Sequence, residues 1–191
     1  MGVVETATLF QATVELLEQS RIEYMTIGGI AAGIWGEPRD TKDADFIVVL
    51  SANQVGPLLL RARESGYEID EQVILMNLQI SGVARLLYGG RFADFIVGES
   101  PFDTSALSRR QGIKVFERTA WVASPEDLIL YKMVAMRDQD IADVRRILIR
   151  QNRALDVGYM TSWAAVLSDK IGKPEIASRL EGMLTEYGLG V

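Results

Sequence analysis

Three aspartates are the side chains whose types and spacing best suit metal or phosphate chemistry. Asp43 and Asp45 are separated by one residue, and Asp94 lies in a second copy of the pentapeptide Ala-Asp-Phe-Ile-Val, found at 44–48 and 93–97. Side chains two apart on a strand point the same way, so Asp43 and Asp45 share a face with Cα atoms roughly 6.5 to 7 Å apart. Their repulsion, on the order of 2 to 3 kcal/mol at an effective dielectric of about 20, would be offset by a bound cation.

A position for Asp94 on an adjacent strand of the same sheet would bring the three carboxylates together. Such a set could hold two Mg2+ or Mn2+ ions about 3.5 to 4 Å apart, because hard cations prefer oxygen ligands. The pair Gly28-Gly29 adds a second feature, since backbone N–H groups at a strand-to-helix junction form a site for an anion such as phosphate. Plainer interpretations stay open. An Asp-x-Asp pair is often two solvated acids, a glycine pair is more often a tight turn, and the repeated pentapeptide also suits two neighbouring core strands.

The composition narrows the chemistry further. The chain of 191 residues contains no Cys and no His, which excludes Ser-His-Asp and Cys-His nucleophilic sites, His proton shuttles and ordinary zinc sites. Its 48% of apolar residues can form a sizeable core within one domain. Neither a signal sequence nor a membrane span is expected, so we expect a cytoplasmic protein without a membrane partner. The formal charge of −6 is not that of a general nucleic-acid binder.

The hydrophobic pattern predicts the elements that must position the aspartates. Gly89-Gly90 between two strand-like runs predicts a β-hairpin, and Ser124 before Pro125 predicts a helix start. The helix and strand alternatives both stay open for 71–81. Helices are predicted at 6–19, 30–35, 52–65, 125–136 and 138–152 and in paired segments ending near 187, and strands at 24–27, 43–50, 83–88, 91–97 and 115–122.

These elements predict an α/β (α+β) fold with a mixed β-sheet and flanking helices. Residues 1–122 would form the core, and residues 123–191 would form a helical C-terminal segment packed on it. The continuous apolar second half of the strand 43–50 is typical of a central strand that is covered on both faces. Asp43, Asp45 and Asp94 would then lie at the rim of such strands.

The glycine pair and the acids together resemble a known family. Ile27-Gly28-Gly29, a spacer of thirteen residues and Asp43-Ala44-Asp45-Phe46 are similar to the signature of the DNA polymerase β-type nucleotidyltransferase superfamily, and Asp94 matches its third acid. The resemblance covers about residues 5–121 and implies the nucleotidyltransferase fold. It implies that Asp43, Asp45 and Asp94 are catalytic and bind Mg2+ or Mn2+, and that Gly28 and Gly29 contact the phosphates of an NTP.

A closer resemblance is to bacterial abortive-infection toxin-like nucleotidyltransferases and their uncharacterised relatives. It rests on Arg39-Asp40-Thr41-Lys42-Asp43-Ala44-Asp45, on Tyr131-Lys132-Met133-Val134-Ala135 and on Arg137-Asp138-Gln139-Asp140-Ile141-Ala142-Asp143, where Gln139 replaces a Lys that is common in the family. The resemblance implies that Arg39, Thr41, Lys132 and Asp140 bind the nucleotide. It favours the 3′ end of a tRNA as the acceptor, and it adds an antitoxin protein to the expected partners.

Each of these assignments has a structural alternative. Lys132 lies in the apolar run Leu-Ile-Leu-Tyr-Lys-Met-Val-Ala-Met, so its ammonium needs an anionic partner such as a triphosphate or must reach water. Arg39 suits a phosphate clamp or a plain surface, and Asp140 and Asp143 suit a site or a helix cap. Arg146, Arg150 and Arg153 share one helix face, which suits an RNA backbone or, more simply, solvent.

Three functions stay open on these grounds. The first is metal-assisted transfer of NMP from an NTP to an acceptor hydroxyl, with the tRNA 3′ end as the favoured acceptor. The second is an antibiotic nucleotidyltransferase with an aminoglycoside or lincosamide as acceptor, since an acidic surface suits cationic drugs. The third is a non-catalytic member of the fold that binds a nucleotide or a partner.

Overall fold

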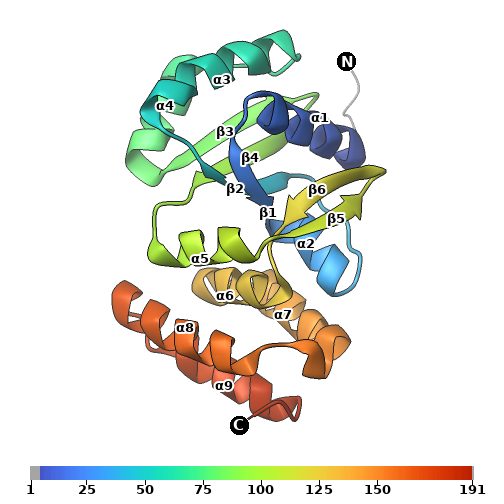
Figure 1. The fold of residues 1–191 in the computed structure, drawn as a ribbon, viewed down its shortest axis with the longest axis vertical. Helices are drawn as coiled ribbons and strands as arrows, with labels where there is room; N and C mark the ends of the chain where they lie inside the picture. Colours follow the sequence, from blue (N-terminus) through green and yellow to red (C-terminus); the bar gives the residue numbers. More distant parts are fainter. Residues whose placement is uncertain (1–4, 191) are drawn as a thin grey trace. The chain divides into compact units, whose positions relative to one another are not determined.

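The computed structural model describes residues 5–190, which divide into two compact units (Figure 1). The first unit contains residues 5–30 and 40–122, and the second contains residues 31–39 and 123–190. The short segment 31–39 therefore groups with residues that follow it by about a hundred positions. Nothing in the sequence pattern indicates this grouping.

The first unit is built on a six-stranded mixed sheet with the strand order β3-β4-β2-β1-β6-β5. The β2–β4 and β1–β6 pairs are parallel, and the other neighbours are antiparallel. The strands are β1 Glu23–Thr26, β2 Ala44–Val49, β3 Val83–Tyr88, β4 Arg91–Val97, β5 Gln111–Val115 and β6 Arg118–Val122. The predicted hairpin is formed by β3 and β4, with both Gly89 and Gly90 at positive φ in the turn.

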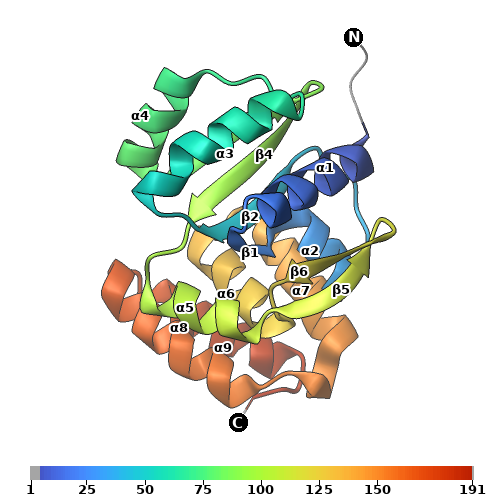
Figure 2. The same cartoon turned by 45° about the horizontal axis from the view of Figure 1, so that its top comes forward.

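Helices pack against this sheet. α1 contacts α3, β2 and β4, and α1 and α3 run side by side in Figure 2. α4 packs on β3, begins with Asp70 accepting a hydrogen bond from Val73 N, and ends at Gly82 in the left-handed conformation, so residues 71–81 are helical. The helices of the first unit are α1 Thr6–Gln19, α3 Ala52–Glu64, α4 Glu71–Ser81 and α5 Pro101–Arg109, while α2 Gly28–Trp35 begins in the first unit and ends in the second.

The side chains of β2 and β4 alternate between two faces of the sheet. The ring of Phe46 stacks on Phe10 of α1 at 5.8 Å between centroids and makes a T-shaped contact with Phe95 at 6.1 Å. Because successive strand residues point to opposite faces, Asp45 and Asp94 lie on the face away from α1. The apolar packing of the α1 face thus fixes which way both acids point.

Two predicted segments differ in the structure. The single strand predicted at 115–122 is a hairpin, in which β5 and β6 are joined at Phe116 and Glu117. Both turn residues adopt positive φ, 46° and 67°, without being glycine, so the usual turn signal is missing from the sequence. The helix α5 was not predicted, although Ser100 and Asp103 form a capping box at its start.

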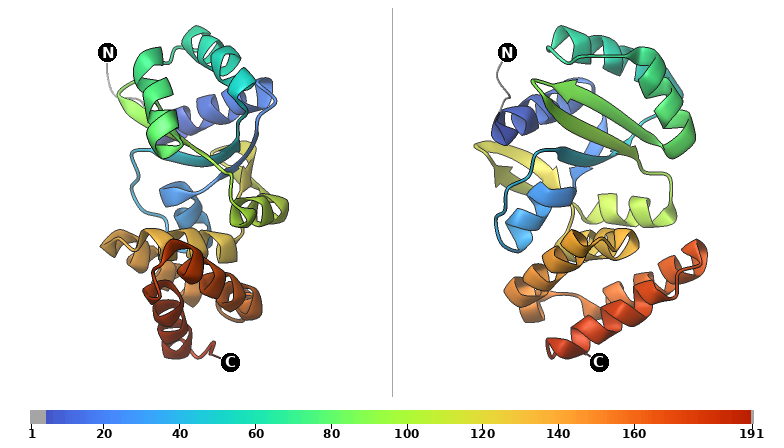
Figure 3. Two further views of the ribbon diagram at one scale, coloured as in Figure 1. Left: turned by 90° about the vertical axis from the view of Figure 1, so that its left-hand side faces the viewer. Right: turned by 180° about the vertical axis from the view of Figure 1, so that it is seen from behind.

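The second unit is helical. α6 packs on α7 and α8, and α8 packs on α9, as the orange and red ribbons of Figure 3 show. The predicted start of α6 is confirmed, because Ser124 accepts a hydrogen bond from Asp127 N and Pro125 is the first helical residue. Its helices are α6 Pro125–Ala135, α7 Asp138–Gln151, the 3-10 turn η1 Asn152–Ala154, α8 Val157–Ile171 and α9 Glu175–Glu186. Within residues 5–190, none of the helices has both the length and the apolar character needed to cross a membrane.

Candidate active site

Asp45 and Asp94 are direct register partners on the adjacent parallel strands β2 and β4. The whole repeated pentapeptide is in register, from Ala44 opposite Ala93 to Val48 opposite Val97. In-register neighbours on a sheet point to the same face, so the two carboxylates lie side by side. Asp43 precedes β2 by one residue and shares the face of Asp45.

Gly28 lies directly against the side chain of Asp45. A β-carbon on Gly28 would lie 1.9 Å from Asp45 Oδ2 and 2.7 Å from Cγ, so only glycine allows this approach. Gly28 also has a φ of 67°, which glycine adopts at little cost. Ile27 N donates to Asp45 O at 2.9 Å, which ties the end of β1 to the acidic strand. The first turn of α2 therefore begins directly beside an acid of the set.

Thr41 shapes the backbone at the start of β2. Its hydroxyl donates to Asp43 O at 3.3 Å, and its own carbonyl accepts a hydrogen bond of 2.6 Å from the Thr6 hydroxyl on α1. These contacts fix the backbone that carries Asp43. The Thr41 side chain is thus engaged with the backbone just before the strand β2.

Arg85 is a site residue that sequence reasoning missed. It is the register partner of Asp94 on β3, and its Nε and Nη2 donate to the two oxygens of Asp94 at 2.7 and 2.6 Å. The hydrogen bond to Asp94, together with the charges of Asp94, Asp43 and Asp45, raises the pKa of Arg85 above its ordinary value although burial opposes this. The turn at Gly89-Gly90 is the signal that could have found Arg85, because a two-residue turn places 85 opposite 94.

Asp43, Asp45 and Asp94 do not surround a single position at which all three could bind one metal ion. Within residues 5–190, no group of three or more Asp or Glu side chains is arranged to hold one ion. For this set the reason is visible, since both oxygens of Asp94 face the Arg85 guanidinium. The donor chemistry still fits a divalent ion, because Asp43 and Asp45 are half-buried carboxylates on one face and carboxylate oxygens are the ligands that Mg2+ and Mn2+ prefer.

The second unit contains a separate cluster of buried charges around Lys132. Lys132 is only 4% exposed, and its ammonium donates to Asp140 at 3.1 Å and to Asp143 at 2.7 Å. Its anionic partners are thus carboxylates of the same unit, and its head group does not reach water. Asp140 also accepts a hydrogen bond from Arg137 N at 3.3 Å, so it caps α7 as well as pairing with Lys132.

Arg39 joins this cluster through Asp143. Its Nε and Nη2 donate to the two Asp143 oxygens, each at 3.0 Å, and Gln139 donates to the same carboxylate at 3.1 Å. Burial would raise the pKa of Asp143, but the hydrogen bonds from Arg39 and Lys132 outweigh it and hold that pKa below its ordinary value. In the same way, burial would raise the pKa of Asp140, and the hydrogen bond from Arg137 and the charge of Lys132 lower it overall.

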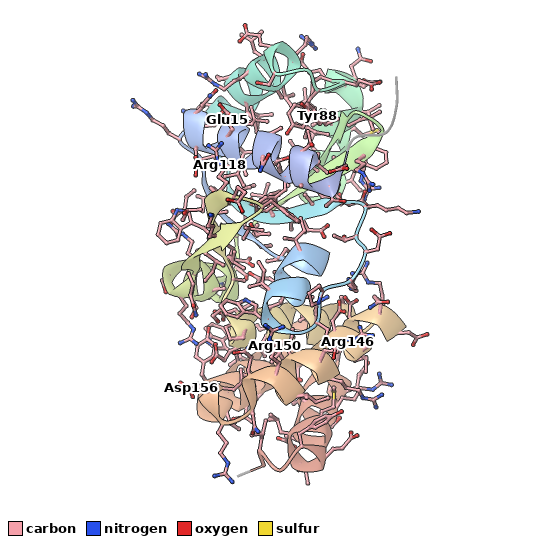
Figure 4. All side chains as sticks on the ribbon, turned by 90° about the vertical axis from the view of Figure 1, so that its right-hand side faces the viewer. Glu15, Tyr88, Arg118, Arg146, Arg150 and Asp156 are labelled. Carbon is pink, nitrogen blue, oxygen red and sulfur yellow. The ribbon has the colours of Figure 1, made fainter. Side chains whose placement is uncertain are left out.

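Two arginines of α7, Arg146 and Arg150, make contacts within the second unit. Arg146 lies 3.5 Å from Glu37, and Arg150 donates to Gly36 O at 2.6 Å, so both face the segment 31–39 (Figure 4). Arg153 lies apart from them in η1 and is exposed. The face predicted as a candidate RNA contact is therefore occupied at two of its three positions.

Known structures share this architecture. The chain matches the crystal structure of ANT(2'')-Ia in complex with adenylyl-2''-tobramycin with a TM-score of 0.59 and 13% sequence identity, over 86% of this chain and 98% of that one. The chain has the nucleotidyltransferase fold. The predicted fold class, α/β (α+β) with a mixed sheet, flanking helices and C-terminal helices, is thus confirmed.

Two further structures have the nucleotidyltransferase fold in common with this chain. The solution structure of ANT(2'')-Ia gives a TM-score of 0.57 and 13% identity, over 95% of this chain and 96% of that one. The crystal structure of the lincosamide antibiotic adenylyltransferase LnuA with bound lincomycin gives 0.50 and 13%, over 77% and 98%. No known protein-family model matches the sequence, and no curated protein does.

Proposed function

We propose that this protein is a metal-dependent nucleotidyltransferase that transfers NMP from an NTP to an acceptor hydroxyl. The observation that carries the proposal is the register of Asp45 and Asp94 on adjacent strands, with Gly28 against Asp45. This arrangement offers carboxylates for a cation next to a helix N-terminus for phosphate. In the reaction, the acceptor oxygen bonds to the α-phosphorus as the bond to pyrophosphate breaks, and the acceptor proton passes to Asp94.

Each residue of the acid set has a distinct task in this proposal. Asp43 and Asp45 bind Mg2+ or Mn2+, and Asp94 completes the set. When bound, the divalent ion neutralises phosphate charge and favours the deprotonated acceptor oxygen. The backbone N–H groups of Gly28 and Gly29, in the first turn of α2, would bind the phosphates of the NTP. Thr41 acts through the backbone of Asp43.

The charged cluster of the second unit supplies the remaining nucleotide-binding candidates. Of the candidates Arg39, Lys132 and Asp140, only Arg39 keeps a sizeable part of its side chain exposed, at 26%, so its guanidinium is the one that could reach a phosphate. Lys132 and Asp140 belong to the proposal as residues that hold this cluster together, because Lys132 bridges Asp140 and Asp143. Their contribution to nucleotide binding would therefore be through the position of Arg39.

A small cationic molecule is the acceptor that the observations favour over a tRNA 3′ end. Arg146 and Arg150, two of the three arginines of the candidate RNA face, are engaged within the second unit. The formal charge of −6 also opposes a polyanionic acceptor and suits a cationic one. ANT(2'')-Ia and LnuA, which share the fold, were solved with adenylyl-2''-tobramycin and with lincomycin.

A transfer screen tests this assignment. The full chain is incubated with each of four NTPs labelled at the α-phosphate, with Mg2+ or Mn2+, and with an aminoglycoside, a lincosamide or total tRNA. We expect label on a small molecule and a loss on the order of 100-fold or more in Asp45→Asn. Asp169→Asn, which removes an exposed carboxylate on α8, is the matched control and should keep full activity.

The other outcomes each correct one part of the proposal. Label on tRNA alone would reverse the choice of acceptor and keep the reaction, and it would restore the toxin-like interpretation with its antitoxin partner. Binding of Mg-NTP by calorimetry without transfer to any acceptor would favour a non-catalytic binding protein. Unchanged transfer in both Asp43→Asn and Asp45→Asn would remove the assigned site.

A further inference from the structure

Asp94 is the most enclosed acid of the set, and its partner is a cation of the chain itself. Asp94 is 7% exposed, and both of its oxygens accept hydrogen bonds from Arg85, at 2.7 and 2.6 Å. The Arg85 guanidinium also lies over the Phe92 ring, with Cζ at 5.0 Å from the centroid. Two residues of β4 therefore hold the end of the Arg85 side chain.

A guanidinium bound in this way and a divalent ion make competing demands on one carboxylate. The two parallel hydrogen bonds of an Arg–carboxylate pair use both oxygens. A divalent ion needs at least one of these oxygens within about 2.0 to 2.2 Å, and its charge repels a guanidinium at that distance. Binding of both cations by Asp94 at once is therefore unfavourable, because the guanidinium uses one lone pair on each oxygen and the two positive charges repel each other.

We propose that Arg85 is a built-in competitor that holds Asp94 in the metal-free protein and releases it when a divalent ion binds beside Asp43 and Asp45. The catalytic meaning of this exchange rests on the proposed function, but the exchange itself is a property of ion binding. It makes Arg85 a positioning residue, which acts through Asp94. It also explains how a buried carboxylate avoids an unpaired charge when the ion is absent.

The surroundings of Arg85 make release of its side chain inexpensive. The Arg85 side chain is 53% exposed, against 10% for that of Asp94, so the guanidinium can move into water while the carboxylate cannot. Arg85 also borders an open hollow of about 400 Å3 that Glu68 and Asp70 help to line. A displaced guanidinium therefore meets solvent and two further carboxylates.

Calorimetric titration of the nucleotide-free full chain with Mn2+ tests the exchange directly. We expect Arg85→Met to bind Mn2+ on the order of tenfold more tightly than the unsubstituted protein, because the ion no longer has to break two charge-assisted hydrogen bonds. Arg85→Lys keeps the charge without the paired geometry and should lie between the two. Asp45→Asn should abolish the titrated site in every background.

Arg91→Met is the matched control for the loss of one positive charge. Arg91 lies on the same hairpin and donates to Lys42 O at 3.2 Å, next to Asp43, while its strand position places it on the other face from Asp94. Its Mn2+ affinity should change by no more than about twofold. An equal gain in Mn2+ affinity in Arg91→Met and Arg85→Met would mean that the loss of one nearby positive charge explains the effect. This result would overturn the proposal.

Thermal unfolding gives a second readout. Metal-free Arg85→Met should unfold at a lower temperature than the metal-free unsubstituted protein. Added Mn2+ should raise the unfolding temperature of Arg85→Met by more than it raises that of the unsubstituted protein. Unchanged or weaker Mn2+ binding in Arg85→Met and in Arg85→Lys would reject the exchange. Failure of the proposed function would give a different result. Arg85→Met would still bind Mn2+ more tightly than the unsubstituted protein, but no acceptor would be labelled in the transfer screen.

Discussion

Gly28 approaches Asp45 so closely that a β-carbon at residue 28 would lie 1.9 Å from the Asp45 carboxylate. We predict that Gly28→Ala pushes this carboxylate out of place and also strains a backbone whose φ is 67°. The free energy of unfolding should fall by about 2 to 4 kcal/mol, since a clash adds to the usual cost of this conformation. Urea unfolding measures the loss, and Mn2+ calorimetry should show weaker ion binding.

Gly82→Ala separates these two causes. Gly82 has nearly the same φ, 68°, and nothing lies within 4 Å of the β-carbon that alanine would add. Its substitution should cost only about 1 to 2 kcal/mol and leave ion binding intact. Equal losses in the free energy of unfolding of Gly28→Ala and Gly82→Ala would mean that the close approach to Asp45 is not the reason for glycine at residue 28.

Lys132 should be essential for stability, whatever its part in binding. Lys132→Met leaves the buried carboxylates of Asp140 and Asp143 without their shared ammonium, so we predict a loss of about 3 to 5 kcal/mol in the free energy of unfolding. Chemical denaturation measures it. Lys170→Met, at an exposed position in the last turn of α8, should change stability by less than about 0.5 kcal/mol.

The same pair of carboxylates predicts how stability depends on pH. The pKa values of Asp140 and Asp143 lie below their unfolded value of about 3.9, so folding favours the charged forms. Their stabilising contribution is complete above that unfolded pKa and is lost as the pH falls through the lower, folded values. Urea midpoints measured from pH 7 to pH 3 should decline below about pH 4, and less steeply in Asp143→Asn.

Chelation should separate activity from folding. Because Arg85 already pairs with Asp94, the fold does not need a divalent ion to neutralise that carboxylate. We predict that EDTA stops nucleotidyl transfer and that added Mg2+ or Mn2+ restores it, while the unfolding temperature in EDTA stays within about 1 °C of the untreated protein. A large fall in the unfolding temperature would show that an ion is part of the fold.

The strands β2 and β4, which carry Asp45 and Asp94, were predictable because the residue pattern that a buried strand requires is local in the sequence. A strand buried on both faces requires a continuous apolar run, and in both β2 and β4 the Asp is followed by the same apolar run, Phe-Ile-Val. The Gly89-Gly90 turn set the register of β3 and β4 in the same way. The pentapeptide repeat was short, yet it marks two strands that lie side by side in matching register.

Other parts depend on contacts that no local pattern shows. α4 carries apolar residues that stay exposed, such as Met76 at 52% and Ile80 at 78%, so its hydrophobic period does not separate helix from strand. The β5–β6 turn uses Phe116 and Glu117 where glycine is usual. The partners of Lys132 lie 8 and 11 residues away, beyond the end of its helix, so only packing decides between an internal carboxylate and a phosphate.

The pairing of Arg39 with Asp143 sets an order of events during synthesis on the ribosome. The two residues are separated by 104 positions, and the segment 31–39 belongs to a unit whose other members begin at residue 123. At about 5 to 20 residues per second, the segment waits roughly 5 to 20 seconds for its partners to be made. The strands on either side of it, β1 and β2, can pair before α7 exists, so the segment 31–39 would have to stay without its helical partners until α7 has been synthesised.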